Sequence, residues 1–140
     1  MKISVEQPEL DYPVTVMQLE GALDASCYLE VIEKAKSIYL AGTRDLLLDF
    51  SQLTFMSSAG LVALHSIALI MRGELPPDPE SGWSVFHAMS HDIEQSVQLE
   101  KHCKLLNPQP RVVKTLKITG YDRILAVYTD KQEALASFSA

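Results

Sequence analysis

The chain has 140 residues, near the usual size of one domain, so an enzyme with a cleft between two domains is not expected. Twelve Lys and Arg residues against 18 Asp and Glu give a net charge of -6, which argues against binding nucleic acid or an anionic membrane through bulk charge. With 47% hydrophobic and 21% charged residues, the composition is that of a folded chain and not of a disordered one.

The cysteine content and the apolar runs bear on the compartment. Cys27 and Cys103 are too few for a disulfide framework, and the first residues lack the apolar run of a signal peptide, so we expect the protein in the reducing cytoplasm. The longest strongly apolar run, residues 61–71, is about half the length of a membrane-spanning helix. No membrane insertion is expected.

The first elements are a predicted hairpin and a helix. Residues 13–19 are rich in β-branched and apolar types and predict a strand that stops at Gly21, and residues 3–5 predict a shorter partner strand. Apolar side chains then recur at helical spacing over residues 25–40. We expect Asp24 to cap this helix.

The next segment predicts a buried strand followed by an apolar helix. Residues 46–48 are three leucines, the pattern of a central strand covered on both faces. The helix opens at residues 57–60 and runs to about Arg72, and its residues 61–71 are apolar nearly all the way round. One face therefore enters the core, while the other needs a cover, which is either a partner protein or the domain's own insertion.

The second half opens with a change of pattern. Residues 73–100 are turn-rich and weakly periodic, which predicts an insertion. The regular elements that follow are a strand at 103–106, a helix introduced by Pro108 and Pro110 and closed by Gly120, a strand at 124–128, and a helix begun by Asp130. The predicted order is ββαβα, insertion, βαβα.

Nucleotide and hydrolase chemistry find little support in the motifs. The chain has neither GxGxxG nor GxxxxGK, so a phosphate-cradling loop is not expected. Ser58 has small neighbours, but Met56 stands where a nucleophile elbow needs glycine, and no general base lies at a recognised spacing. A small hydrolase using Ser58 remains a rival that an esterase assay should exclude.

Other candidate sites have simpler structural interpretations. His87 and His91 have a spacing that suits zinc, and Asp92 and Glu94 could join them, but surface histidines in an irregular insertion fit better. No metal or other cofactor is therefore expected.

The remaining pairs are also explained by structure. Asp24 and Asp49 stand at element ends, where capping and turn formation explain them better than acid–base catalysis. His102 beside Cys103 is adjacency in a strand, where neighbours point to opposite faces. Trp83 and Phe86 fit a local hydrophobic cluster better than a ligand platform.

Two serines at the start of the apolar helix are the most informative polar residues. Ser57 is a plausible N-cap and Ser58 a first-turn residue, where backbone N–H groups and the helix dipole favour negative charge. A phosphate on Ser58 would add about two negative charges without unfolding the helix, and it would weaken a complementary interface. The alternative is that both serines only cap.

The sequence resembles the STAS domain family of bacterial anti-sigma factor antagonists. The segments that carry the resemblance are Leu-Leu-Leu-Asp-Phe-Ser-Gln-Leu-Thr-Phe-Met-Ser-Ser-Ala-Gly-Leu-Val-Ala-Leu at 46–64, Gly-Ala-Leu-Asp-Ala at 21–25, residues 106–112, Leu116, residues 119–121 and residues 130–134. The resemblance implies a single α/β STAS-like domain over residues 1–140, with a mixed sheet, helices packed mainly on one face and an insertion at about 73–100.

The resemblance also implies a function, that of a non-enzymatic partner switch. In the family, the antagonist binds an anti-sigma factor that is also a serine protein kinase, the kinase phosphorylates a serine of the antagonist and so releases it, and a protein phosphatase resets the cycle. Transferred to this chain, the acceptor is Ser58. The implied partner-binding residues are Asp24, Ser57, Ser58, Ala59, Gly60 and Leu61. Binding of nucleic acid is not expected, and a homodimer is left open.

The chain departs from the family pattern in two places. Ser57 stands where the family usually has Asp, and the insertion replaces a short connection. The first departure favours an alternative function, a STAS scaffold or sensor module that is not phosphorylated and works in a signalling or transport assembly. The insertion, at the other end of the helix from Ser58, would restrict partner choice or mediate dimerisation.

Overall fold

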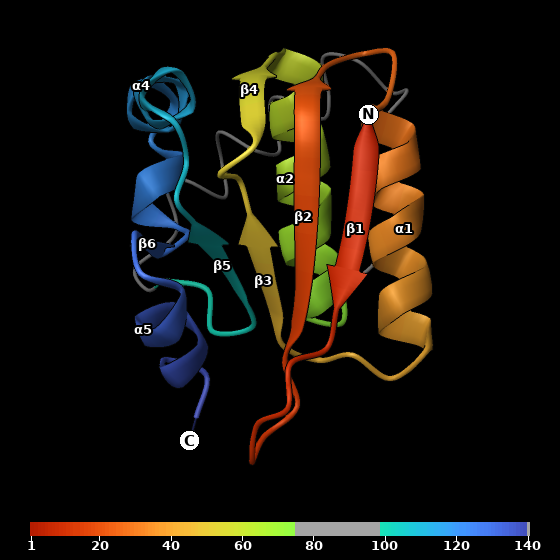
Figure 1. Cartoon of the computed structure of the whole chain (residues 1–140). Coiled ribbons are helices and arrows are strands. Elements are labelled where there is room, and N and C mark those ends of the chain that lie inside the picture. The colour runs from red at the N-terminus through yellow and green to blue at the C-terminus, as the bar shows by residue number, and fades with distance from the viewer. Residues whose placement is uncertain (75–98, 140) are drawn as a thin grey trace.

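The strands of the computed structural model, which describes residues 1–74 and 99–139, form a mixed sheet (Figure 1). The strands are β1 (Lys2–Glu6), β2 (Thr15–Leu23), β3 (Leu46–Asp49), β4 (Leu53–Met56), β5 (Cys103–Leu106) and β6 (Val127–Tyr128). The helices are α1 (Tyr28–Leu40), α2 (Ser58–Met71), α4 (Pro110–Thr119) and α5 (Lys131–Ala136). β1 is antiparallel to β2, and the other pairings are parallel, in the order β1-β2-β3-β5-β6 with β4 also beside β2. The predicted mixed α/β fold is confirmed.

The central strand β3 divides its leucines between two hydrophobic layers. Leu46 and Leu48 belong to the larger core, which they share with residues of α1, α2 and α4. Leu47 points to the smaller core on the other face, where it packs with Val16 and with Leu135 of α5. The continuous apolar run therefore arises because β3 is covered on both faces, as predicted, with the helices mainly on one face.

The helix α2 corrects one expectation from the sequence. Every residue from Gly60 to Met71 is buried within the chain, so of the two alternatives for the outer face of this helix, the one with a partner protein is wrong. The helix packs against the sheet with α1 alongside it, as Figure 1 shows. In addition, Nδ1 of His65 is hydrogen-bonded to the hydroxyl of the buried Tyr121. A helix enclosed by its own domain needs apolar residues on all sides.

The C-terminal strand is shorter than the sequence predicts. Residues 124–128 were expected to form a strand, but β6 comprises only Val127 and Tyr128. Ile124 and Leu125 follow a short 3-10 helix (Tyr121–Arg123), and both their N–H groups donate to the carbonyl of Tyr121. Their apolar side chains enter the core from a turn, so burial alone produced the strand-like pattern.

The insertion was predicted at residues 73–100, and most of it lies outside the described residues. The candidate groups His87, His91, Asp92 and Glu94 and the aromatic pair Trp83 and Phe86 all fall there. Regular structure resumes at Cys103, where the sequence predicted it.

Candidate functional site

The carboxyl ends of β2 and β4 bring two of the predicted site segments to one edge of the sheet. Leu23 pairs with Met56 in a parallel register, and the N–H of Ser57 donates to the carbonyl of Leu23 at 3.0 Å. Asp24 directly follows β2, and Ser58 directly follows Ser57. We call residues 22–24 and 55–61 the Ser58 edge. The strand β4 was not predicted from the sequence; it has only four residues and carries the polar Thr54 between apolar ones.

The start of α2 presents one serine to solvent and uses the other as a cap. The Ser57 side chain accepts a hydrogen bond from the N–H of Gly60 at 3.3 Å, so its predicted N-cap role is confirmed. Ser58 is exposed in the first turn, and Ala59 is half-buried. A negative charge added to Ser58 would lie where the helix dipole is favourable.

Gly60 allows the first turn of α2 to touch the end of β2. A Cβ added to Gly60 would lie 2.7 Å from the carbonyl oxygen of Leu23 and 2.7 Å from Cγ of Met56. Since real Cβ atoms do not approach so closely, only glycine fits without movement. Gly60 and the neighbouring Leu61 are buried, so they support the exposed Ser58 from beneath.

Asp24 holds the loop between β2 and α1, and it does not cap the helix as the sequence predicted. The helix begins only at Tyr28, because the preceding residues form a turn in which the Asp24 carbonyl accepts from the N–H groups of Cys27 and Tyr28. The Asp24 carboxylate accepts from the hydroxyl of Ser26 at 2.6 Å and from its N–H at 2.9 Å. These two hydrogen bonds lower the pKa of Asp24, and the bond from the Ser26 hydroxyl has the larger effect. Asp24 therefore keeps a negative charge at neutral pH.

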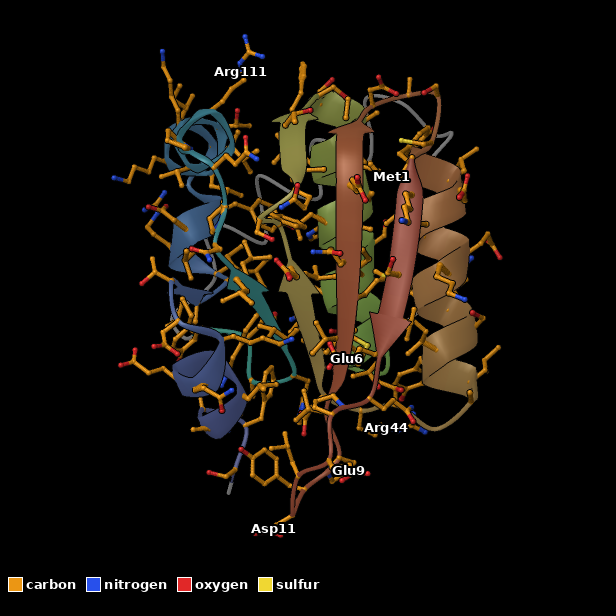
Figure 2. All side chains as sticks on the ribbon, viewed as in Figure 1. Met1, Glu6, Glu9, Asp11, Arg44 and Arg111 are labelled. Carbon is orange, nitrogen blue, oxygen red and sulfur yellow. The ribbon has the colours of Figure 1, made fainter. Side chains whose placement is uncertain are left out.

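An exposed aromatic side chain lies at this edge and was not singled out from the sequence. Phe55 is 37% exposed although it belongs to β4, and the guanidinium carbon of Arg111 lies 5.9 Å from its ring centroid. Figure 2 shows Arg111 at the end of the molecule where α2 begins. An aromatic residue in an apolar segment looks like a core residue in the sequence, and only the register of β4 turns it outward.

The other candidate residues do not assemble into a catalytic or metal centre. His102 pairs with Asp45 at 2.8 Å, while burial raises the pKa of the Cys103 thiol well above its usual range. Asp49 accepts from the N–H of Ser51 at 3.0 Å, the turn role that the sequence predicted. Among the described residues, no three His, Cys, Asp or Glu side chains are grouped to hold a metal ion. Within the same residues, no helix is long and apolar enough to span a bilayer.

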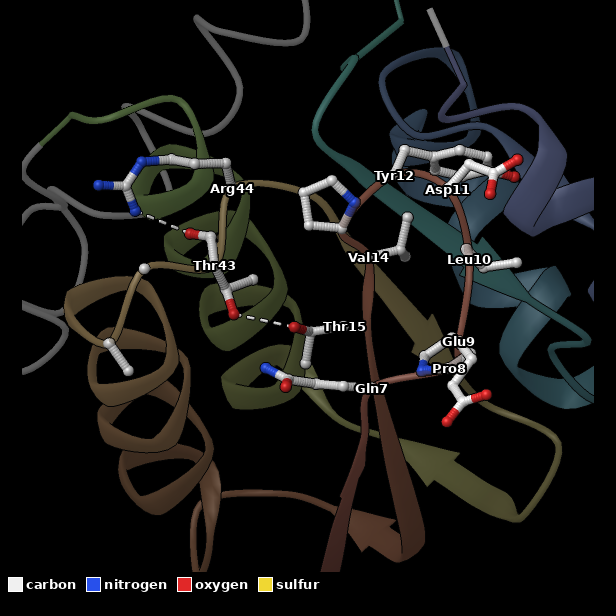
Figure 3. A pocket seen from close by; sticks show the side chains of 13 residues that line it. Gln7, Pro8, Glu9, Leu10, Asp11, Tyr12, Val14, Thr15, Thr43 and Arg44 are labelled. Atoms are coloured by element: carbon white, nitrogen blue, oxygen red, sulfur yellow. Dashed lines mark hydrogen bonds between the residues drawn. The ribbon is translucent and has the colours of Figure 1, made fainter.

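A pocket of about 600 Å³ lies at the opposite end of the sheet and contains none of the predicted site residues (Figure 3). It is formed by the β1–β2 loop and the α1–β3 loop. The hydroxyls of Thr15 and Thr43 bond to each other at 2.8 Å, and Arg44 donates to the carbonyls of Tyr39 and Thr43. Because none of the predicted site residues lies in this pocket, the Ser58 edge remains the candidate site.

Comparisons with known proteins agree with this architecture. A structure titled as an anti-sigma factor antagonist from Mycobacterium paratuberculosis shares 18% sequence identity, covering 98% of this chain and 94% of that one with a TM-score of 0.65. The Bacillus cell fate determinant SpoIIAA in the phosphorylated form also shares 18% identity, covering 99% of this chain and 100% of that one with a TM-score of 0.57. A comparison with curated protein sequences gives no match. The STAS domain family model matches residues 3–72, which run from β1 to the end of α2 and include the whole Ser58 edge. The chain belongs to the STAS domain family.

Proposed function

We propose that this protein is an anti-sigma factor antagonist, a binding protein and not an enzyme, whose partner binding is switched by phosphorylation of Ser58. The observation that carries the proposal is the placement of Ser58, an exposed hydroxyl in the first turn of an otherwise buried helix. Structural neighbours at 18% identity include proteins titled as anti-sigma factor antagonists, one of them in a phosphorylated form. These neighbours support the general role.

The proposed partner is an anti-sigma factor with serine protein kinase activity. It would contact the exposed Ser58 and the half-buried Asp24, Ser57 and Ala59 of the Ser58 edge, while the buried Gly60 and Leu61 fix the position of the turn. The kinase transfers the γ-phosphoryl group of ATP to the Ser58 hydroxyl, with loss of its proton and release of ADP. A protein phosphatase then hydrolyses the phosphoserine and restores the hydroxyl. We place this cycle in the cytoplasm.

The physical effect of the phosphate differs between the free protein and the complex. In the free protein, the phosphate stays in water at the start of α2, where the dipole tolerates negative charge. In the complex, the same charge would lose its water at the interface, beside the loop that contains the negatively charged Asp24 and without a counter-ion. Phosphorylation therefore weakens binding and leaves the free energy of unfolding nearly unchanged.

The test is incubation with the cognate kinase and ATP, followed by mass spectrometry. We expect one phosphate, on Ser58, and none in Ser58→Ala. The variant Ser58→Asp should lower partner affinity by roughly 1 to 3 kcal/mol, about five- to 150-fold, because a charge is desolvated at the interface. Its urea midpoint should stay close to that of the wild type.

Ser57 is the internal control, since its hydroxyl is engaged in capping. Phosphate on Ser57 or on no residue, or wild-type affinity of Ser58→Asp, would contradict the switch. That outcome would favour the alternative, a STAS scaffold or sensor that is not phosphorylated, which Ser57 in place of the family's Asp also favours. Restoring the carboxylate with Ser57→Asp would then show whether its loss abolished phosphorylation.

A further inference from the structure

The helix α4 carries positive charge on a chain that is acidic overall. Arg111, Lys114 and Lys117 are exposed, and no Asp or Glu occurs from Asn107 to Gly120. None of these three cations makes an ion pair with any described residue. Three uncompensated cations on one short helix contrast with the net charge of -6.

The same face of α4 exposes apolar surface. Val112 and Leu116 are buried in the larger core, and the cations lie on the side of the helix away from them. Ile118 falls on this outer side, since it is seven residues from Arg111 and four from Lys114, and it is 75% exposed. One exposed isoleucine is common on a protein surface, but Ile118 lies among three cations on the same side of the helix.

A shallow pocket of about 510 Å³ joins these features. It is lined by Pro108, Pro110, Val113, Lys114, Lys117 and Ile118. The lining thus combines two prolines and two branched apolar side chains with the side chains of two lysines. The residues of this groove are chemically complementary to an apolar side chain that is flanked by carboxylates.

We propose that this face of α4, with the groove beside Pro108 and Pro110, is a docking surface for an acidic amphipathic segment of a protein partner. Charge complementarity identifies the occupant, because unpaired cations around an apolar groove attract a segment with acidic and apolar residues at helical spacing. An anionic membrane or nucleic acid fits less well, since the rest of the acidic chain would be repelled. The proposal goes beyond the Ser58 switch, because it requires neither phosphorylation nor a kinase.

The surface lies close to the Ser58 edge. Arg111, at the start of α4, contacts the exposed ring of Phe55 in β4, two residues before Ser57. A partner seated at the Ser58 edge could therefore extend over α4 without a break in the contact surface. The basic face would then supply affinity that a phosphate on Ser58 does not directly remove.

The experiment uses the full chain labelled with ¹⁵N and a synthetic peptide of about 18 residues, with leucines at helical spacing and glutamates elsewhere. We expect saturable amide shifts centred on residues 108–118, and binding that weakens as NaCl is raised. Lys114→Glu should lower the affinity for the peptide two- to fivefold, roughly the effect of one exposed pair. The triple variant, in which Arg111, Lys114 and Lys117 are all replaced by Glu, should lower it at least about tenfold. Ile118→Ser should also weaken binding.

Matched controls separate this surface from bulk charge, from unfolding and from the Ser58 switch. Lys34→Glu makes the same charge change at an exposed position of α1, and it should bind the peptide as the wild type does. The peptide titration uses the unphosphorylated chain and no kinase, so a failed phosphorylation switch would leave this result intact. Circular dichroism and amide spectra confirm that each variant is folded.

Three outcomes would overturn the proposal. The first is an equal loss of affinity in Lys34→Glu and Lys114→Glu, which would mean bulk attraction only. The second is a peptide of the same composition, with its leucines moved off helical spacing, that binds as tightly. The third is binding to phosphatidylglycerol vesicles without binding to the peptide, which would assign the face to a membrane.

Discussion

Gly60 shows how one residue sets the geometry of the Ser58 edge. Glycine normally weakens a helix by about 1 kcal/mol relative to alanine, so an alanine here would favour the isolated helix. The tertiary contact opposes this preference, because the added methyl group would overlap the carbonyl oxygen of Leu23 and the side chain of Met56. The backbone oxygen cannot rotate away as a flexible side chain can. We therefore expect the clash to outweigh the helix preference, so that an alanine at this position destabilises the protein.

Gly60→Ala is therefore predicted to lower the free energy of unfolding by about 1–3 kcal/mol, the usual cost of overpacking. Urea unfolding followed by circular dichroism measures the change. Ser58→Ala, an exposed substitution in the same turn, should stay within about 0.5 kcal/mol of the wild type. A stabilised Gly60→Ala variant would show that α2 can move away from β2 at little cost.

At the scale of elements, α5 illustrates a helix that exists because of its contacts. Six residues are too few for a stable helix in water, so its formation depends on caps and packing. The Asp130 carboxylate accepts from the N–H groups of Gln132 and Glu133 at one end. At the other end, Lys104 of β5 donates to both the carbonyl and the hydroxyl of Ser137 at 2.9 Å.

Removing the cap should release this helix. Asp130→Ala is predicted to lower the free energy of unfolding by about 1 kcal/mol, since two N–H groups lose their acceptor. In this variant, amide hydrogen exchange should become faster in α5 and stay unchanged in β3. Asp122→Ala removes an exposed carboxylate elsewhere and serves as the control, with an effect below about 0.5 kcal/mol. Equal effects of the two variants would mean that the cap contributes nothing beyond charge.

At the scale of the whole molecule, a single arginine holds the two ends of the insertion together. The Nε group of Arg72 lies 3.1 Å from a carboxylate oxygen of Glu74 and 3.2 Å from one of Glu100. The backbone fixes both ends as well, because the N–H of Glu74 donates to Leu69 and that of Glu100 to Ile124. Neighbouring ends need only a short connection, and the entropic cost of closing a loop changes slowly with its length.

We predict that replacing residues 75–98 with about six Gly and Ser residues leaves a folded domain. Unfolding in urea should remain a single cooperative transition, because the described strands and helices have their own cores. Retained amide shifts at the Ser58 edge would show that the site survives. An aggregated or molten product would instead place Trp83 and Phe86 in the core and contradict the prediction.

The sequence by itself determined the features that depend on neighbouring residues. The periods of apolar residues gave the order of the main elements, since each regular structure repeats its buried side at a fixed spacing. The caps Ser57 and Asp130 and the stop at Gly120, whose φ is 80°, were predictable for the same reason. The motif at residues 57–60 also drew attention to the start of α2 before its surroundings were known.

Only the tertiary structure decided which surfaces remain exposed. The burial of α2, the outward position of Phe55 and the turn that replaces the first half of the expected last strand all depend on elements distant in the sequence. Asp24 gave the same lesson, because an acidic residue before a helical pattern suits either a cap or a separate turn. An apolar residue in the sequence indicates that burial of its side chain is favourable. Which side chains it packs against, which face of the sheet it points to and the register of its strand are fixed by long-range packing.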